Sequence, residues 1–297
     1  MKPAKLHPRQ KNIIRRSAEW LAYPDRPGKL QGDLDYLAGK LAEAAPAGKI
    51  GTALMFLANH YSIAACDAFG RGDATDLATF IGWTIDLNAL LVRLQGAYVV
   101  TNPDEDTNTP QEFWCGLHAA GPLLLSDWHG ARVCAEFYVA MAEKDHRLRH
   151  ADRRLLRHGT VDPFLIRLFA ESFGIETSFQ PTQPLIPQYE DLLRTWRRED
   201  MGAFQLAMQA AAEFHVTRSK FGTDRTSYEF EHYFDQVFPV ELLAVQALRR
   251  RDGLPDWQTG HPLVDTTWPV IRDLPLAQRH PLAVAAEQQF LPQPNFR

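Results

Sequence analysis

The clearest indication of the fold is the segment of residues 54–98, which reads LMFLANHYSIAACDAFGRGDATDLATFIGWTIDLNALLVRLQGAY. Its apolar residues recur at spacings of three and four, the pattern of an α-helix with one buried face. They are Leu54, Leu57, Ala58, Tyr61, Ala65 and Ala68 in the first half, and Leu77, Phe80, Ile81, Thr84, Leu87, Leu91, Leu94 and Tyr98 in the second. Between the halves, Asp73 follows Gly-Arg-Gly and suits the N-cap of the second helix. The segment therefore predicts two helices joined by a tight turn.

The same spacing predicts further helices at residues 133–141, 164–173, 189–198, 204–216 and 240–250. The last of them is followed by Gly253 and Pro255, which are typical of a helix end. Alternation of apolar and polar residues, which is typical of strands, is nearly absent, and residues 98–100 and 177–179 are the best strand candidates. The predicted fold class is all-α, an αα-hairpin bundle or repeat-like array.

A weak internal repeat relates residues 69–77 to residues 196–204. In both segments an aromatic residue, an Arg and a capping Asp lead from one apolar helix to the next, so the αα-hairpin is used twice. We predict a single all-helical domain over residues 1–297. A division into two lobes, 1–150 and 160–297, is an alternative within that domain.

The amino-acid composition limits the classes of protein to which this chain can belong. The chain has 297 residues, of which 45% are hydrophobic and 23% charged, as in soluble globular proteins. A net charge of −4 provides no general attraction to nucleic acid or anionic lipid. The three cysteines, Cys66, Cys115 and Cys134, are far apart among apolar neighbours, which favours buried thiols over disulfides or a zinc site. With no apolar run that suits a signal peptide or a membrane span, we predict a cytoplasmic protein that binds neither membrane nor nucleic acid.

The most basic stretch, residues 143–158, contains His146 and His150 one helical turn apart, a spacing that suits two ligands of one metal ion. Neighbouring cations would repel such an ion, so a solvated face is favoured over a metal site or an anion-binding patch. The chain has no phosphate-binding glycine motif and no nucleophile elbow. We therefore predict no catalytic residue, no metal and no cofactor.

An acidic-aromatic segment, residues 227–238, reads SYEFEHYFDQVF. Three interpretations are open: a kinked connection with its aromatic residues in the core, a contact surface for a partner protein, or an active site that uses Glu229, Glu231 and His232. The polar loop of residues 101–110 is a second candidate surface. As contact candidates we take Tyr228, Glu229, Glu231, Tyr233 and Asp235, together with Asp104, Glu105 and Asp106.

One stretch carries a resemblance to known proteins. Residues 238–254 read FPVELLAVQALRRRDGL and are followed by His261-Pro262-Leu263-Val264. This part resembles the C-terminal part of the all-helical immunity proteins of bacterial polymorphic toxin systems, especially the immunity protein 49 family. In those proteins a P-V-E-x-L-A helix ends in a charged, Gly-containing turn and leads to a short final segment. The likeness covers roughly residues 185–264. A second group of helical immunity proteins, which neutralises DNase toxins, has similar features.

The resemblance implies a cytoplasmic inhibitor that binds a cognate toxin effector domain stoichiometrically and protects the cell that makes the toxin. Such a protein needs a rigid scaffold and a complementary surface, without catalytic residues of its own. Two alternatives come from other classes: an α-helical metal-dependent hydrolase that uses the carboxylates and histidines named above, and a helical-repeat adaptor protein.

Overall fold

The computed structural model describes residues 5–102, 113–148, 161–181, 184–199, 201–223, 225–226, 228–256, 258–292 and 296. The fold is all-α, as predicted, with the helices packed as a bundle and no strand among the described residues. The helices are α1 (Pro8–Leu21), α2 (Arg26–Ala42), α3 (Ala47–Arg71), α4 (Ala74–Thr101), α5 (Phe113–Leu124), α6 (Trp128–Leu148), α8 (Val161–Phe173), α9 (Pro187–Thr195), α10 (Met201–Arg218), α11 (Tyr233–Val237), α12 (Val240–Arg251), α13 (Pro262–Asp265), α14 (Trp268–Ile271) and α15 (Pro281–Phe290).

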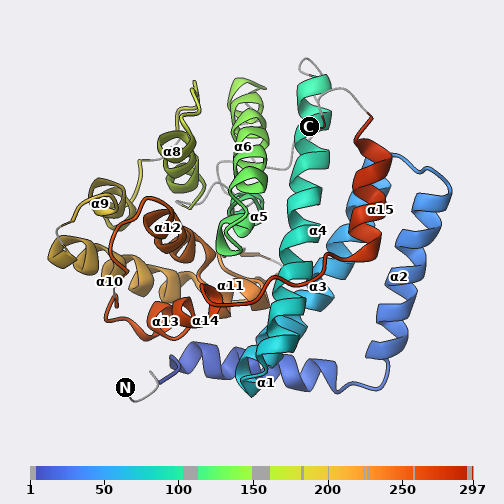
Figure 1. Ribbon diagram of the computed structural model, residues 1–297, viewed down its shortest axis with the longest axis horizontal. Coiled ribbons are helices and arrows are strands. Elements are labelled where there is room, and N and C mark those ends of the chain that lie inside the picture. The colour runs from blue at the N-terminus through green and yellow to red at the C-terminus, as the bar shows by residue number, and fades with distance from the viewer. Residues whose placement is uncertain are drawn as a thin grey trace.

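The hairpin of α3 and α4 organises the molecule (Figure 1). On one side α1 and α2 pack on α3, and on the other α5 and α6 pack on α4. A second hairpin, α9 and α10, lies at the opposite end of the bundle from α2, and α12 connects that end to α5 (Figure 1). Near the C-terminus α15 returns to pack on α2 and α4. Both hairpins predicted from the internal repeat are present.

The turn between α3 and α4 has the predicted capping geometry. Gly72 ends α3 in the left-handed region at φ +69°, and the Asp73 side chain accepts a hydrogen bond from the Asp76 N–H at 3.0 Å. The Arg71 guanidinium bonds to the carboxylates of Asp67, Asp73 and Asp76. A left-handed glycine and a side-chain cap satisfy backbone groups that a helix end leaves unpaired. The hairpin is therefore closed by local interactions as well as by its core.

The end of α12 is also as predicted, with Gly253 in the left-handed region at φ +72°. One of the arginines in its last turn is buried rather than solvated. The Arg249 guanidinium donates hydrogen bonds to the backbone carbonyls of Trp196, Arg198 and Pro255. Because one planar cation bonds to three backbone carbonyls, this arginine connects α12 to the turn between α9 and α10.

Two groups of buried apolar side chains form the core. The larger extends from Ile13 of α1 to Ile271 of α14 and includes residues from both of the lobes considered above. The smaller lies between α2, α3, α4 and α15 and includes Leu37, Leu54 and Phe290. The larger group includes residues on both sides of residues 149–160, which lie outside the described residues. All three cysteines are buried and free, as predicted.

Helix α4 is long and apolar enough to span a membrane, although we expected no such segment from the sequence. More than half of its most apolar window is buried inside the protein. This is the pattern of a helix at the centre of a bundle, covered on one side by α3 and on others by α5 and α6.

Three helices begin with the same kind of N-cap, a histidine side chain. His7, His261 and His280 each precede a proline, and each accepts a hydrogen bond at Nδ1 from the backbone N–H two residues further on, at 3.2 Å. An imidazole can accept there only while Nδ1 carries no proton. Burial lowers the pKa of all three side chains. The three caps at α1, α13 and α15 therefore depend on neutral histidines.

We expect stability to decrease as the pH falls from about 7.5 to about 5. Histidines of the unfolded chain titrate near 6.5, while the capping histidines stay neutral to lower pH, so the unfolded state binds more protons in this window. The variant His7→Asn keeps a capping oxygen that cannot be protonated, and its stability should depend less on pH than that of the wild type. Thermal unfolding followed by circular dichroism at several pH values measures this.

The matched control is His129→Asn, because His129 is exposed on α6. This variant should retain the pH dependence of the wild type. Equal pH dependence of His7→Asn and wild type would contradict the role given to the cap.

Candidate functional site

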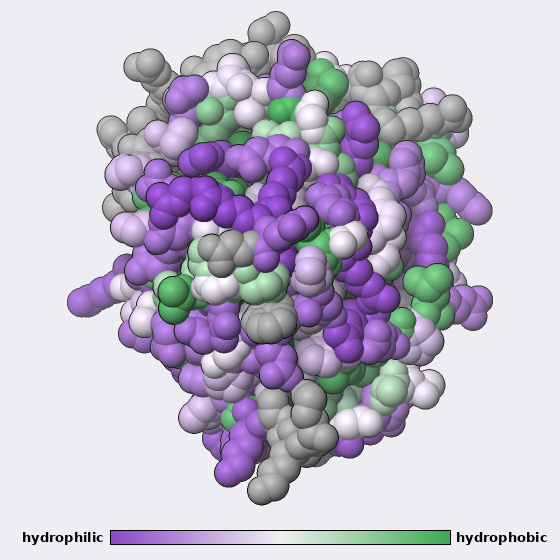
Figure 2. All heavy atoms as spheres, turned by 60° about the vertical axis from the view of Figure 1, so that its left-hand side comes forward, coloured by the Kyte–Doolittle hydropathy of each residue, from purple (hydrophilic) through white to green (hydrophobic). Residues whose placement is uncertain are grey.

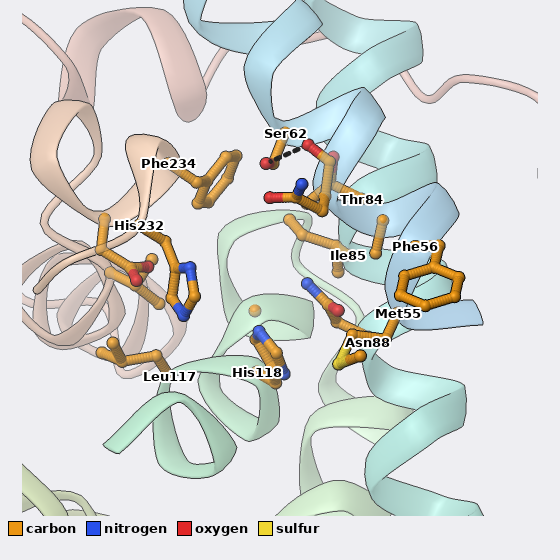
Figure 3. A pocket seen from close by; sticks show the side chains of 15 residues that line it. Met55, Phe56, Ser62, Thr84, Ile85, Asn88, Leu117, His118, His232 and Phe234 are labelled. Carbon is orange, nitrogen blue, oxygen red and sulfur yellow. Dashed lines mark hydrogen bonds between the residues drawn. The ribbon is translucent and has the colours of Figure 1, made fainter. Parts of the chain in front are cut away.

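A pocket of about 430 Å³ lies between α3, α4, α5 and the segment that leads into α11 and α12 (Figure 3). Its size is in the range of small-molecule sites. Its wall combines apolar side chains with seven polar ones, and no lysine or arginine lines it. The lining residues are Met55, Phe56, Ala58, Asn59, Ser62, Thr84, Ile85, Asn88, Leu117, His118, Gly121, His232, Phe234, Asp235 and Val240.

Two imidazoles, those of His118 on α5 and His232 before α11, converge on this pocket (Figure 3). Burial and, to a smaller extent, the nearby His232 lower the pKa of His118 to about 3. Nδ1 of His118 is buried and has no hydrogen-bond partner among the described residues. Burial also lowers the pKa of His232, against the opposing charge of Glu231. Both rings are therefore neutral near pH 7, and His118 offers an unsatisfied nitrogen.

The wall formed by α3 and α4 provides amides and hydroxyls. The side-chain amides of Asn59 and Asn88 make no hydrogen bond to any described residue. The hydroxyls of Ser62 and Thr84 donate to carbonyls of their own helices, each at 2.7 Å. A hydroxyl that donates in this way keeps its lone pairs for an incoming donor. This side of the pocket can both donate and accept hydrogen bonds.

The pocket has one carboxyl group, that of Asp235, and it is buried. Burial raises its pKa well above the usual value, and the negative charges of Glu241 and Glu231 raise it further. Burial therefore disfavours the charged form of this carboxyl. The wall has no lysine or arginine, and burial disfavours the charged forms of both imidazoles and of its one carboxyl.

Only part of the acidic-aromatic segment is at the surface, which corrects two of the contact candidates. Glu229 and Asp235 are buried, so neither side chain is placed to contact a partner in this conformation. Tyr228, Glu231 and Tyr233 are half-buried. The Glu231 carboxylate accepts a hydrogen bond from the backbone N–H of Tyr228 at 3.2 Å. The segment is mainly a connection packed into the core, the first of the three interpretations.

The buried residues of this segment surround a polar pair in the core. His215 of α10 and Glu241 of α12 are fully buried, with Nδ1 and Oε1 2.7 Å apart. The other ring nitrogen of His215 lies 2.9 Å from the backbone carbonyl oxygen of Asp235, and Phe230 stacks on the ring at 3.8 Å. The Tyr189 hydroxyl of α9 also donates to Glu241, at 3.4 Å. This network joins α9, α10 and α12 to the residues that close the pocket.

The remaining candidates from the sequence lie elsewhere. Asp104, Glu105, Asp106 and His150 fall outside the described residues, as does all of the basic stretch after residue 148. His146 belongs to α6, but its side chain is not described. Of the residues considered for an active site, His232 alone lines the pocket. The described residues contain no group of three or more His, Cys, Asp or Glu placed to hold a metal ion.

The amides and hydroxyls of the pocket were missed at the sequence level, although a signal exists. Asn59 and Ser62 are three residues apart on α3, and Thr84 and Asn88 are four apart on α4. Polar residues at helical spacing on two adjacent, otherwise apolar helices indicate a shared polar face. Comparison with known proteins provides no further guide: no family model, no curated protein and no solved structure matches this chain.

We expect Glu241→Ala to destabilise the protein by about 3 kcal/mol, because it leaves His215 and the Tyr189 hydroxyl buried without their partner. Chemical denaturation measures the free energy of unfolding. Glu190→Ala removes an exposed carboxylate from α9 and is the matched control, with an expected change within about 0.5 kcal/mol. A free energy for Glu241→Ala equal to that of the control would contradict a structural role for the network.

Proposed function

We propose that this protein is a cytoplasmic immunity protein, which binds a cognate toxin effector domain and neutralises it by a stoichiometric protein–protein contact. The resemblance of residues 185–264 to helical immunity proteins suggests this class. The observation that carries the proposal is a surface on α1, α2 and α3 where large apolar side chains are exposed together with cations. We call it the aromatic–cation surface and define it by Trp20, Tyr23, Arg26, Lys29, Tyr36, Lys40, Met55 and Phe56.

This surface is rich in exposed apolar side chains. Tyr23 is 59% exposed and Phe56 42%, and Tyr36 and Met55 are similarly exposed. These four are among nine large apolar side chains exposed in the described part of the chain, and the other five are spread over other elements. By contrast, the face of the molecule that carries α9 and α10 is mainly hydrophilic (Figure 2). Grouped aromatic residues on a surface mark a site of protein contact.

Cations lie close to the aromatic rings of this surface. The Arg26 guanidinium lies 4.3 Å from the centre of the Trp20 ring and 5.8 Å from that of Tyr23. Lys29 lies 5.8 Å from the ring of Phe56, and Lys40 lies 5.5 Å from that of Tyr36. Tyr, Trp and Arg are the residues that most often dominate binding energy, and rings that are already ordered lose little entropy on binding. The surface is suited to act as an anchor.

Acidic side chains beside the rings provide charges of the opposite sign. Asp25 lies 3.6 Å from Arg26, and Asp33 lies 3.6 Å from Lys29. Mixed charges around apolar anchors select a partner by complementarity more than by net attraction. We therefore propose α1–α3 as the contact surface in place of the acidic-aromatic segment. Tyr228, Glu231 and Tyr233 of that segment remain half-exposed candidates.

We expect the double variant Tyr23→Ser, Tyr36→Ser to bind the toxin domain at least tenfold more weakly than the wild type, because it removes two ordered anchors. Calorimetric titration with the toxin domain encoded by the neighbouring gene measures the dissociation constant. Growth rescue in cells that express both proteins should decrease in parallel.

The matched control is Leu206→Ser, Leu276→Ser, which removes two exposed apolar side chains from α10 and from the segment before α15. It should bind the toxin domain as the wild type does. Absence of binding by the wild-type protein, or an equal loss of affinity in the two double variants, would contradict the proposal.

The two converging imidazoles favour a second candidate function, an enzyme that moves protons at a bound substrate. His232→Gln separates the two functions. If the protein acts by contact alone, the variant binds the toxin domain and protects cells as the wild type does. If the pocket is catalytic, protection is lost although toxin binding is retained.

A further inference from the structure

The pocket between α3, α4 and α5 has polar groups that the protein itself leaves unsatisfied. Asn59 is exposed and Asn88 half-buried, and their amides make no hydrogen bond to any described residue, whereas Nδ1 of His118 is buried and has no partner there either. An unpaired polar group in such a place costs about 1–3 kcal/mol. Because native proteins satisfy nearly all buried polar groups, Nδ1 of His118 requires a partner that the described residues do not supply, and the two amides are available to the same ligand.

The charges of the pocket restrict that partner. An anion would meet no lysine or arginine in the wall and would face Asp235, with Glu231 and Glu241 behind it. A cation would find Asp235 as its one carboxyl group in the wall, and the burial of that group disfavours its charged form. Moving a charge into such a site without a counter-charge is costly. An uncharged molecule avoids this cost.

The shape of the wall restricts the partner further. Ile85, Leu117 and Phe234 give the pocket an apolar side, and Met55 and Phe56 form an exposed apolar edge on α3 (Figure 3). The hydrogen-bonding groups of α3 and α4 can both donate and accept. A ligand that fits both sides has an apolar body and an edge on which a donor and an acceptor are adjacent, as in a carboxamide.

We propose that this pocket binds a small uncharged molecule that carries a planar, amide-like edge on an apolar ring. The ligand satisfies the amides of Asn59 and Asn88 and the imidazole of His118, and its ring lies against the apolar wall. This inference goes beyond toxin neutralisation, because contact through the aromatic–cation surface requires no small molecule.

A series of ring compounds of matched shape tests the proposal on the unaltered protein at about pH 7.5. Benzamide presents the amide edge, benzoate carries a negative charge, benzamidine carries a positive charge, and toluene has no polar edge. We expect saturable binding of benzamide in ligand-observed NMR, with the other three compounds at least tenfold weaker. Failure of benzamide to bind, or equal binding of benzoate or benzamidine, would overturn the proposal.

Two variants locate the ligand. Asn88→Leu replaces the amide by an apolar group of similar size and should weaken benzamide at least tenfold. Thr84→Val provides a second test with little change in shape, and a loss of binding there is also expected. Asn12→Leu, on the exposed face of α1, makes the same exchange as Asn88→Leu outside the pocket and should leave binding unchanged. Benzamide binding that is unaffected by both pocket variants would place the ligand elsewhere and overturn the assignment.

The outcome is independent of the proposed function. Tyr23→Ser, Tyr36→Ser changes residues that do not line the pocket, so it should bind benzamide as the wild type does even where toxin binding is lost. Loss of benzamide binding in this variant would contradict a pocket separate from the docking surface.

Discussion

The arrangement of the second half of the chain depends on the buried contact between His215 and Glu241. Two polar side chains without access to water are stable only while they bond to each other and to their neighbours. This requirement sets α10 against α12 and positions α11, because Asp235 of α11 provides the carbonyl that faces the second ring nitrogen. His232, Phe234 and Asp235 wall the pocket from that side. The pocket is thus shaped by a contact outside it.

Helix α3 connects the two surfaces to which we assign functions. Its exposed residues Met55 and Phe56 belong to the aromatic–cation surface and also form an edge of the pocket, while Asn59 and Ser62, one turn further, also line the pocket. The surface has charges of both signs around apolar anchors, whereas the pocket wall has no lysine or arginine and one buried carboxyl group. These environments suit different partners, a protein for the first and a small uncharged molecule for the second.

The fold class, both hairpins and the cap at Asp73 could be predicted because they depend on local spacing and on residues a few positions apart. The position of a carboxylate in the core or at the surface could not. Glu229 and Asp235 look like surface residues in the sequence, but the tertiary packing buries them, and α11, which carries Asp235, packs on α1 and α3. The pocket combines side chains from Met55 to Val240, so its composition follows from tertiary packing, although the paired polar residues of α3 and α4 provided a partial signal.

We propose that the protein acts through the surface of α1–α3. The most direct test is hydrogen–deuterium exchange of the protein, alone and mixed with its proposed partner, a toxin domain expected from the neighbouring gene. We predict slower exchange in the complex over residues 20–42 and 55–60, with little change over α9 and α10. Slower exchange confined to residues 228–236 or to α9 and α10, with α2 unchanged, would contradict the account.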